Sequence, residues 1–183
     1  MDGQSVDRLR TNRRVVKGRG RQRYLGVGLG VAAGAAMLFP AVTYADVTVP
    51  ATGSPCPAEL AGSMTLLPDE RTYVRCEEQP GADFGWRQVQ TPFDPNDTWL
   101  SYGPAITLHG QGMRNPNLTS GSWIATPQDT ETSCKATQTT VVEAGVLAEP
   151  ESTEGEPGTV LALQMLPRLF YVELAGNCLW AKQ

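Results

Sequence analysis

The chain has 183 residues, with 15 Lys/Arg against 19 Asp/Glu and a single histidine, and these charges are unevenly distributed. Eight of the basic residues but only two of the acidic ones lie in residues 1–24. Seven basic and 17 acidic residues therefore remain in residues 46–183, a formal charge of −10. So acidic a segment excludes nucleic acid and anionic lipid from its expected partners.

Residues 1–45 are typical of an export signal. A basic n-region, residues 1–24, precedes the uncharged residues 25–45, in which Thr43 and Ala45 occupy the −3 and −1 positions of a cleavage site. The same uncharged segment has 21 residues, just enough to span a bilayer as an uncleaved anchor. Both alternatives, a signal peptide and a membrane anchor, keep the basic end in the cytoplasm and deliver everything after residue 45 outside. Contact with the membrane is expected only through residues 25–45.

A short linker with Pro and Gly, residues 46–55, precedes one exported domain, residues 56–183. An even number of cysteines in an oxidising compartment predicts two disulfides; the cysteines are Cys56, Cys76, Cys134 and Cys178. Three pairings are possible, and we favour Cys56–Cys76 with Cys134–Cys178 because nearer partners close smaller loops. No CxxC motif occurs, and we expect neither a metal site nor a cofactor.

The domain contains many short alternating or β-branched runs separated by Gly/Pro turns. After one helical turn at residues 57–60, strands are expected at residues 71–76, 84–91, 98–102, 105–109, 122–126 and 134–142. Gly103-Pro104 is expected to separate two of them, and the acidic residues 149–158 to form an exposed loop. This pattern predicts an all-β fold, a small disulfide-stabilised β-sandwich or barrel behind an N-terminal signal or anchor helix.

The C-terminal residues 159–180 are the most hydrophobic part of the domain. We expect a strand at 160–166, a break at Pro167, a second strand after it, and a Gly176-Asn177 turn before Cys178. Apolar residues on both faces of 160–166 predict a central strand that is covered on both sides.

The second half of the domain resembles small exported disulfide-bonded β-domains of actinobacterial cell envelopes. The matching features are Gly121-Ser122-Trp123, Cys134, the hydrophobic run from Thr159, and Phe170 followed by Gly176-Asn177-Cys178-Leu179-Trp180. The family pattern has an aromatic residue after its first cysteine, where this chain has Lys135. The resemblance covers residues 121–180 and implies the fold, a Cys134–Cys178 disulfide and an envelope location, but no chemistry.

The aromatic residues of the domain are the main candidates for a binding site. They cluster on or beside the expected strands, and the candidates are Trp86, Trp99, Tyr102 and Trp123, with Phe93 nearby. Exposed coplanar rings on a β-sheet can stack sugars, whereas the same rings pointing inward form a core. We favour the core for most of them because a small domain needs large buried side chains.

Evidence for catalysis is weak. The only histidine, His109, would need a nearby Ser or Thr nucleophile and an orienting acid, and no GxSxG motif occurs. We therefore expect a non-enzymatic binding or interaction module of the cell envelope, whose partner is an envelope ligand or another exported protein. One alternative is an accessory subunit of an envelope membrane complex, held by an uncleaved anchor. The other is a small exported hydrolase that uses His109 or a carboxylate pair.

Overall fold

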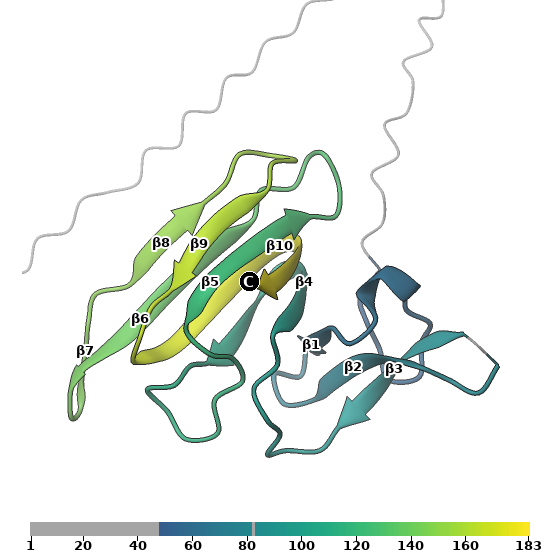
Figure 1. Cartoon of the computed structure of the whole chain (residues 1–183), viewed down its shortest axis with the longest axis horizontal. Helices are drawn as coiled ribbons and strands as arrows, with labels where there is room; N and C mark the ends of the chain where they lie inside the picture. The colour runs from purple at the N-terminus through teal and green to yellow at the C-terminus, as the bar shows by residue number, and fades with distance from the viewer. Residues whose placement is uncertain (1–47, 82) are drawn as a thin grey trace, which may run out of the picture. The chain divides into compact units, whose positions relative to one another are not determined.

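The computed structural model describes residues 48–81 and 83–183, and the predicted signal or anchor segment lies outside them (Figure 1). The described residues form one turn of 3-10 helix, η1 (Ala58–Leu60), and the strands β1 (Met64–Leu66), β2 (Tyr73–Glu78), β3 (Phe84–Val89), β4 (Thr98–His109), β5 (Gly121–Pro127), β6 (Lys135–Glu143), β7 (Val146–Leu147), β8 (Glu151–Glu154), β9 (Leu161–Met165) and β10 (Leu169–Lys182). Within them, no helix has the length and apolar character needed to cross a membrane. The predicted all-β class and the helical turn are confirmed.

The long strand β10 is the centre of the sheet. One edge pairs antiparallel with β4 from Tyr171↔His109 to Ala181↔Thr98. The other edge is shared, because residues 169–175 pair with β6 and residues 178–182 pair with β5. β5 continues the sheet to β9, and β6 continues it to β7 and β8. β4 continues it in the other direction through β1, β2 and β3, so that all strands belong to one branched arrangement.

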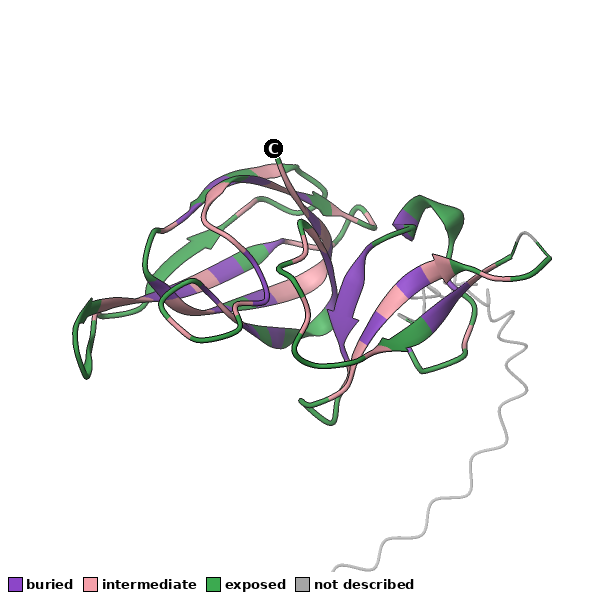
Figure 2. Ribbon diagram, turned by 60° about the horizontal axis from the view of Figure 1, so that its bottom comes forward, coloured by how far each residue is buried: buried purple, intermediate pink, exposed green. Residues whose placement is uncertain are grey.

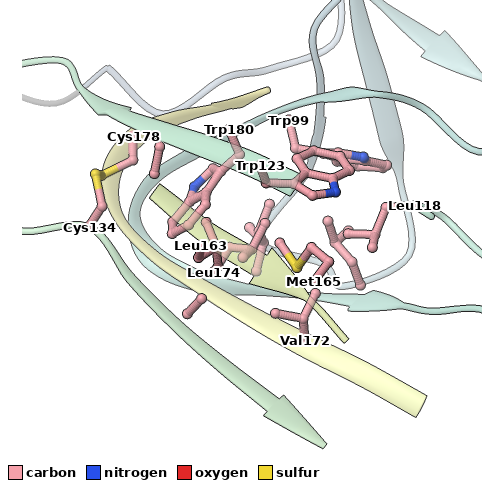
Figure 3. Close-up of a cluster of buried hydrophobic side chains, with 14 of the residues drawn as sticks. Trp99, Leu118, Trp123, Cys134, Leu163, Met165, Val172, Leu174, Cys178 and Trp180 are labelled. Carbon is pink, nitrogen blue, oxygen red and sulfur yellow. A yellow bond between two sulfur atoms is a disulfide. The ribbon is translucent and has the colours of Figure 1, made fainter. Parts of the chain in front are cut away.

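Two clusters of buried side chains hold these strands together. The larger one fills the space between β4, β5, β6, β9 and β10 and includes Trp99, Trp123 and Trp180 (Figure 3). The smaller one is formed by residues of η1, β2, β3 and β4 and includes Trp86 and Leu100. The buried residues follow the strands, whereas the turns are mainly exposed (Figure 2).

Both favoured disulfides are formed, Cys56–Cys76 and Cys134–Cys178. Each belongs to a different core cluster, the first to the smaller and the second to the larger. The prediction from loop length is therefore confirmed for both pairs.

Two predicted breaks lie within continuous strands, and this is a correction to the sequence-based expectation. β4 runs through Gly103-Pro104, and β10 runs through Gly176-Asn177. The two glycines face each other across the ladder where its register shifts, and both have positive φ, 116° and 91°. They form an irregularity in the ladder, of the kind that β-bulges produce, because glycine accepts the backbone angles that such a site requires.

The predicted central strand at 160–166 is also wrong. β9 pairs only with β5 and lies at the edge of the sheet, and its residues alternate between buried and accessible positions. Val160, which we expected inside, is 54% exposed. The central position belongs to β10 instead. A short strand, β8, forms within the acidic segment 149–158, which is exposed as predicted.

Part of the predicted linker belongs to the folded domain. The main-chain nitrogen of Gly53 donates to the carbonyl of Trp86 at 2.7 Å, and the nitrogen of Trp86 donates to the carbonyl of Ser54 at 2.9 Å. Pro50 is buried. This segment therefore covers the outer edge of β3, which would otherwise present unpaired backbone groups to other chains.

The turn at residues 128–134 separates β5 from β6, and Asp129 organises it. Its Oδ1 accepts hydrogen bonds from the nitrogens of Glu131 and Thr132, at 3.1 and 2.7 Å. Its Oδ2 accepts from the Thr132 hydroxyl at 2.8 Å and from the Asn177 amide at 3.1 Å. The Thr132 hydroxyl, followed by the Asn177 amide, lowers the pKa of Asp129 despite an opposing effect of partial burial.

A lowered pKa makes this turn sensitive to acid. The carboxylate of Asp129 stabilises the folded state above its unfolded pKa, about 3.9, and this contribution is lost as the pH falls through the lower folded pKa. We expect the melting temperature of Asp129→Asn to fall less steeply below about pH 4 than that of the wild type. Thermal unfolding between pH 2 and 7 measures this. Glu156→Gln, in an exposed turn, is the control, and identical profiles for Asp129→Asn and wild type would contradict the assignment.

Candidate functional site

A groove lies where β3 and β4 end and β2 begins. It has a volume of about 380 Å³, and we call it the His109 groove. It is lined by Tyr73, Thr91, Pro92, Phe93, His109, Met113, Arg114, Asn115 and Asn117. A neighbouring hollow of about 420 Å³ shares Pro92, Phe93 and Asn115 with it, so the accessible surface extends past the groove.

Asn117 holds the walls of the groove together. Its side-chain oxygen accepts a hydrogen bond from the main-chain nitrogen of His109 at 2.7 Å and one from the Tyr73 hydroxyl at 3.4 Å. Its own main-chain nitrogen donates to the His109 carbonyl at 2.8 Å, and its carbonyl accepts from the nitrogen of Asn96 at 2.9 Å. One buried residue therefore joins the end of β4, the start of β2 and the segment after β3, the first two through its side chain and the third through its main chain.

Two half-buried aromatic rings form one side of the groove. The rings of Tyr73 and Phe93 meet edge to face, with centroids 5.0 Å apart and planes 69° apart. Behind them lies the fully buried Trp99, whose centroid is 6.1 Å from that of Tyr73. Burial raises the pKa of Tyr73, against the opposing effect of its bond to Asn117, so the hydroxyl stays neutral and donates. Both rings are half-buried and line the groove, where this Tyr73–Phe93 platform can contact a ligand ring.

The basic groups of the groove are not neutralised from within. In the part of the chain that the structure describes, the imidazole of His109 and the guanidinium of Arg114 have no side-chain hydrogen bond, and no carboxylate lines the groove. The groove therefore combines aromatic surface with two free basic donors.

This geometry gives a hydrolase little support. A triad needs a hydroxyl nucleophile and an orienting acid close to His109. Thr91 is the one hydroxyl besides Tyr73 that lines the groove, and it makes no side-chain hydrogen bond with the imidazole. Asp94 lines the neighbouring hollow but not the groove itself.

The four aromatic residues predicted from the sequence do not form a common platform. Their exposed fractions are small, at Trp86 3%, Trp99 0%, Tyr102 4% and Trp123 1%. The polar atoms of Trp99, Tyr102 and Trp123 are bound to the main chain; for example, the Tyr102 hydroxyl donates to the Leu66 carbonyl at 2.8 Å. The interpretation of these residues as an exposed stacking surface is therefore wrong, and the interpretation as core is correct, because each points to the inward side of its strand.

Trp86 and Tyr102 nevertheless line a second cavity, of about 270 Å³, together with Pro50, Leu100 and Asp129. Only their edges reach it, and the carboxylate of Asp129 is already occupied by the turn that it organises. We regard this smaller cavity as a weaker candidate than the His109 groove. No group of three His, Cys, Asp or Glu side chains suited to a metal ion occurs in residues 48–81 and 83–183.

Comparisons of the chain with protein-family models, characterised proteins and solved structures find no match. Inferences about function therefore rest on the residues and geometry described above.

Three residues of the groove escaped the sequence-based prediction, namely Tyr73, Arg114 and Asn117. Tyr73 lies in an alternating run that indicated only a strand, and Arg114 lies outside every predicted strand. Asn117 is 5% exposed, and its role depends on that burial. The burial of a single asparagine after a strand cannot be recognised from the sequence, so no signal was available for Asn117.

Proposed function

We propose that the chain is an exported cell-envelope protein whose β-domain, a small sandwich or barrel, is a non-enzymatic binding module with the His109 groove as its ligand site. The observation that carries this proposal is the half-buried Tyr73–Phe93 pair beside the free basic groups of His109 and Arg114. Such a site can stack a ring and hold a polar or negatively charged substituent.

Export is supported by two independent features. The first is the signal-like pattern of residues 1–45, which directs the following residues out of the cytoplasm. The second is the pair of disulfides, which are typical of oxidising compartments. The resemblance of residues 121–180 to actinobacterial envelope domains fits the same location.

Binding of the full-length protein to an insoluble wall preparation from its native host tests the groove. We expect Phe93→Ala and Arg114→Gln to weaken retention at least about tenfold, because each removes a central contact. Val160→Ala and Arg168→Gln are matched controls, since both residues are exposed and neither lines the groove. Circular dichroism verifies that each variant is folded. Equal retention of all four variants would contradict the assignment.

An accessory subunit held by an uncleaved anchor is a second candidate, favoured by the 21-residue length of the segment 25–45. The intact mass of the protein isolated from its host separates the two cases. A mass that begins at Asp46 indicates a cleaved signal, whereas the full-length mass indicates an anchor.

A further inference from the structure

Two arginines lie directly opposite each other on β2 and β3. Arg75 pairs with Arg87 in the antiparallel register of these strands. In the adjacent pair, Cys76 and Trp86, the main-chain N–H and C=O groups bond to segments outside β2 and β3 and not to each other. In an antiparallel ladder the two kinds of pair alternate, so Arg75 and Arg87 form a hydrogen-bonded pair. Their side chains project from the same face with Cβ atoms about 5.5 Å apart. Like charges in this position destabilise a sheet.

Glu77 lies on the same face, two residues from Arg75, but it forms no ion pair with either arginine. Among residues 48–81 and 83–183 the one ion pair is Lys135–Glu154, although acidic side chains greatly outnumber basic ones. The Nε of Arg75 is buried without a hydrogen-bond partner, and its Nη2 contacts only the sulfur of Met64, at 3.4 Å. Arg87 is exposed. The two arginines therefore have N–H donors without hydrogen-bond partners, at a position where the repulsion between their charges destabilises the fold.

A third donor lies beside the arginines. A Cβ at Gly85 would lie 1.7 Å from the side-chain nitrogen of Gln79, so the absence of a side chain at Gly85 leaves room for this amide. Gly85 is two residues from Arg87 on β3 and therefore faces the same side of the sheet. Gln79 and Arg87 also line a hollow of about 400 Å³ at the outer edge of β3.

The arginine pair also adjoins the His109 groove. Tyr73 is two residues before Arg75 on β2, so the two side chains share a face and are about 7 Å apart along the strand. Arg114 and His109 thus line the groove, and the arginine pair lies beyond Tyr73 on the same face of β2 and β3.

We propose that Arg75, Arg87 and the amide of Gln79 form an oxyanion-binding site, which takes a phosphate or carboxylate group of an acidic envelope polymer. Guanidinium groups bind both oxyanions through paired N–H donors. A bound anion would neutralise the repulsion between the arginines and would supply a partner for their free donors. The site is separate from the groove and does not require the groove to bind.

Thermal unfolding of the full-length protein tests this site, with inorganic phosphate and sodium galacturonate as probes and sodium chloride of equal ionic strength as the reference. At a probe concentration about ten times Kd we expect the wild-type melting temperature to rise by about 4 °C. The larger response identifies phosphate or carboxylate as the preferred group.

Arg87→Gln should lose this response, and in chloride it should be at least as stable as wild type because the repulsion is removed. Arg168→Gln, which removes an exposed arginine of the turn between β9 and β10, should respond like wild type. Equal responses of all three proteins, or no response in the wild type, would overturn the proposal. Phe93→Ala should keep the response, so a failure of the groove and a failure of this site give different results.

Discussion

Replacing Cys134 and Cys178 together by alanine is expected to lower the free energy of unfolding by about 4 kcal/mol. The disulfide joins residues 44 apart, and closing a loop of this length restricts the unfolded chain by about that amount. In the folded state it joins the residue before β6 to the position on β10 where pairing with β6 ends and pairing with β5 begins. Both cysteines are fully buried, so the loss also loosens the larger core.

Urea unfolding of the full-length protein, followed by tryptophan fluorescence, measures this change. The matched control is the double replacement of Cys56 and Cys76, which are 20 residues apart and should cost about 3 kcal/mol. A domain of this size has a total stability of roughly 5–15 kcal/mol, so either loss is large. A cost below about 1 kcal/mol for the Cys134–Cys178 pair would show that this disulfide does not support the fold.

Trp180→Ala is expected to cost about 4 kcal/mol, as deletions of large buried rings do. Trp180 is 0% exposed and lies on β10 between Trp99 of β4 and Ala125 of β5. Its indole nitrogen donates to the Ser101 hydroxyl at 2.8 Å, and Ser101 is itself fully buried. The substitution therefore leaves a cavity and also removes the donor to a buried oxygen.

Trp180→Phe separates these two contributions because it retains an aromatic ring but lacks the N–H. We expect it to cost about half as much, and urea unfolding followed by circular dichroism measures both variants. If Trp180→Ala loses less than about 1 kcal/mol, Trp180 does not anchor the larger core as described.

The sequence was informative where local chemistry decides the outcome. Cys56 and Cys134 have nearer partners, and loop closure alone favours the pairing that forms. The β-rich run after Pro167 indicated a strand, and β10 is the most extensively paired strand of the domain. In both cases the information lies within one segment or in the spacing of one residue type.

Prediction from sequence failed where distant segments decide the outcome. Gly103 and Gly176 each read as a break, but they face each other in a continuous ladder, and only the pairing of β4 with β10 shows this. The groove likewise combines the start of β2 with the ends of β3 and β4. Asn117 joins these segments through hydrogen bonds between residues up to 44 positions apart. The hydrophobic periodicity of a single segment cannot predict such long-range contacts.

Photo-crosslinking in the native envelope tests the central proposal most directly. A photoreactive amino acid would replace Phe93 of the full-length protein in one strain and Val160, exposed and outside the groove, in another. We predict a discrete adduct with an envelope component from position 93 and none from position 160. Equal labelling from both positions, or no adduct from position 93 in a correctly exported protein, would contradict a ligand site in the His109 groove.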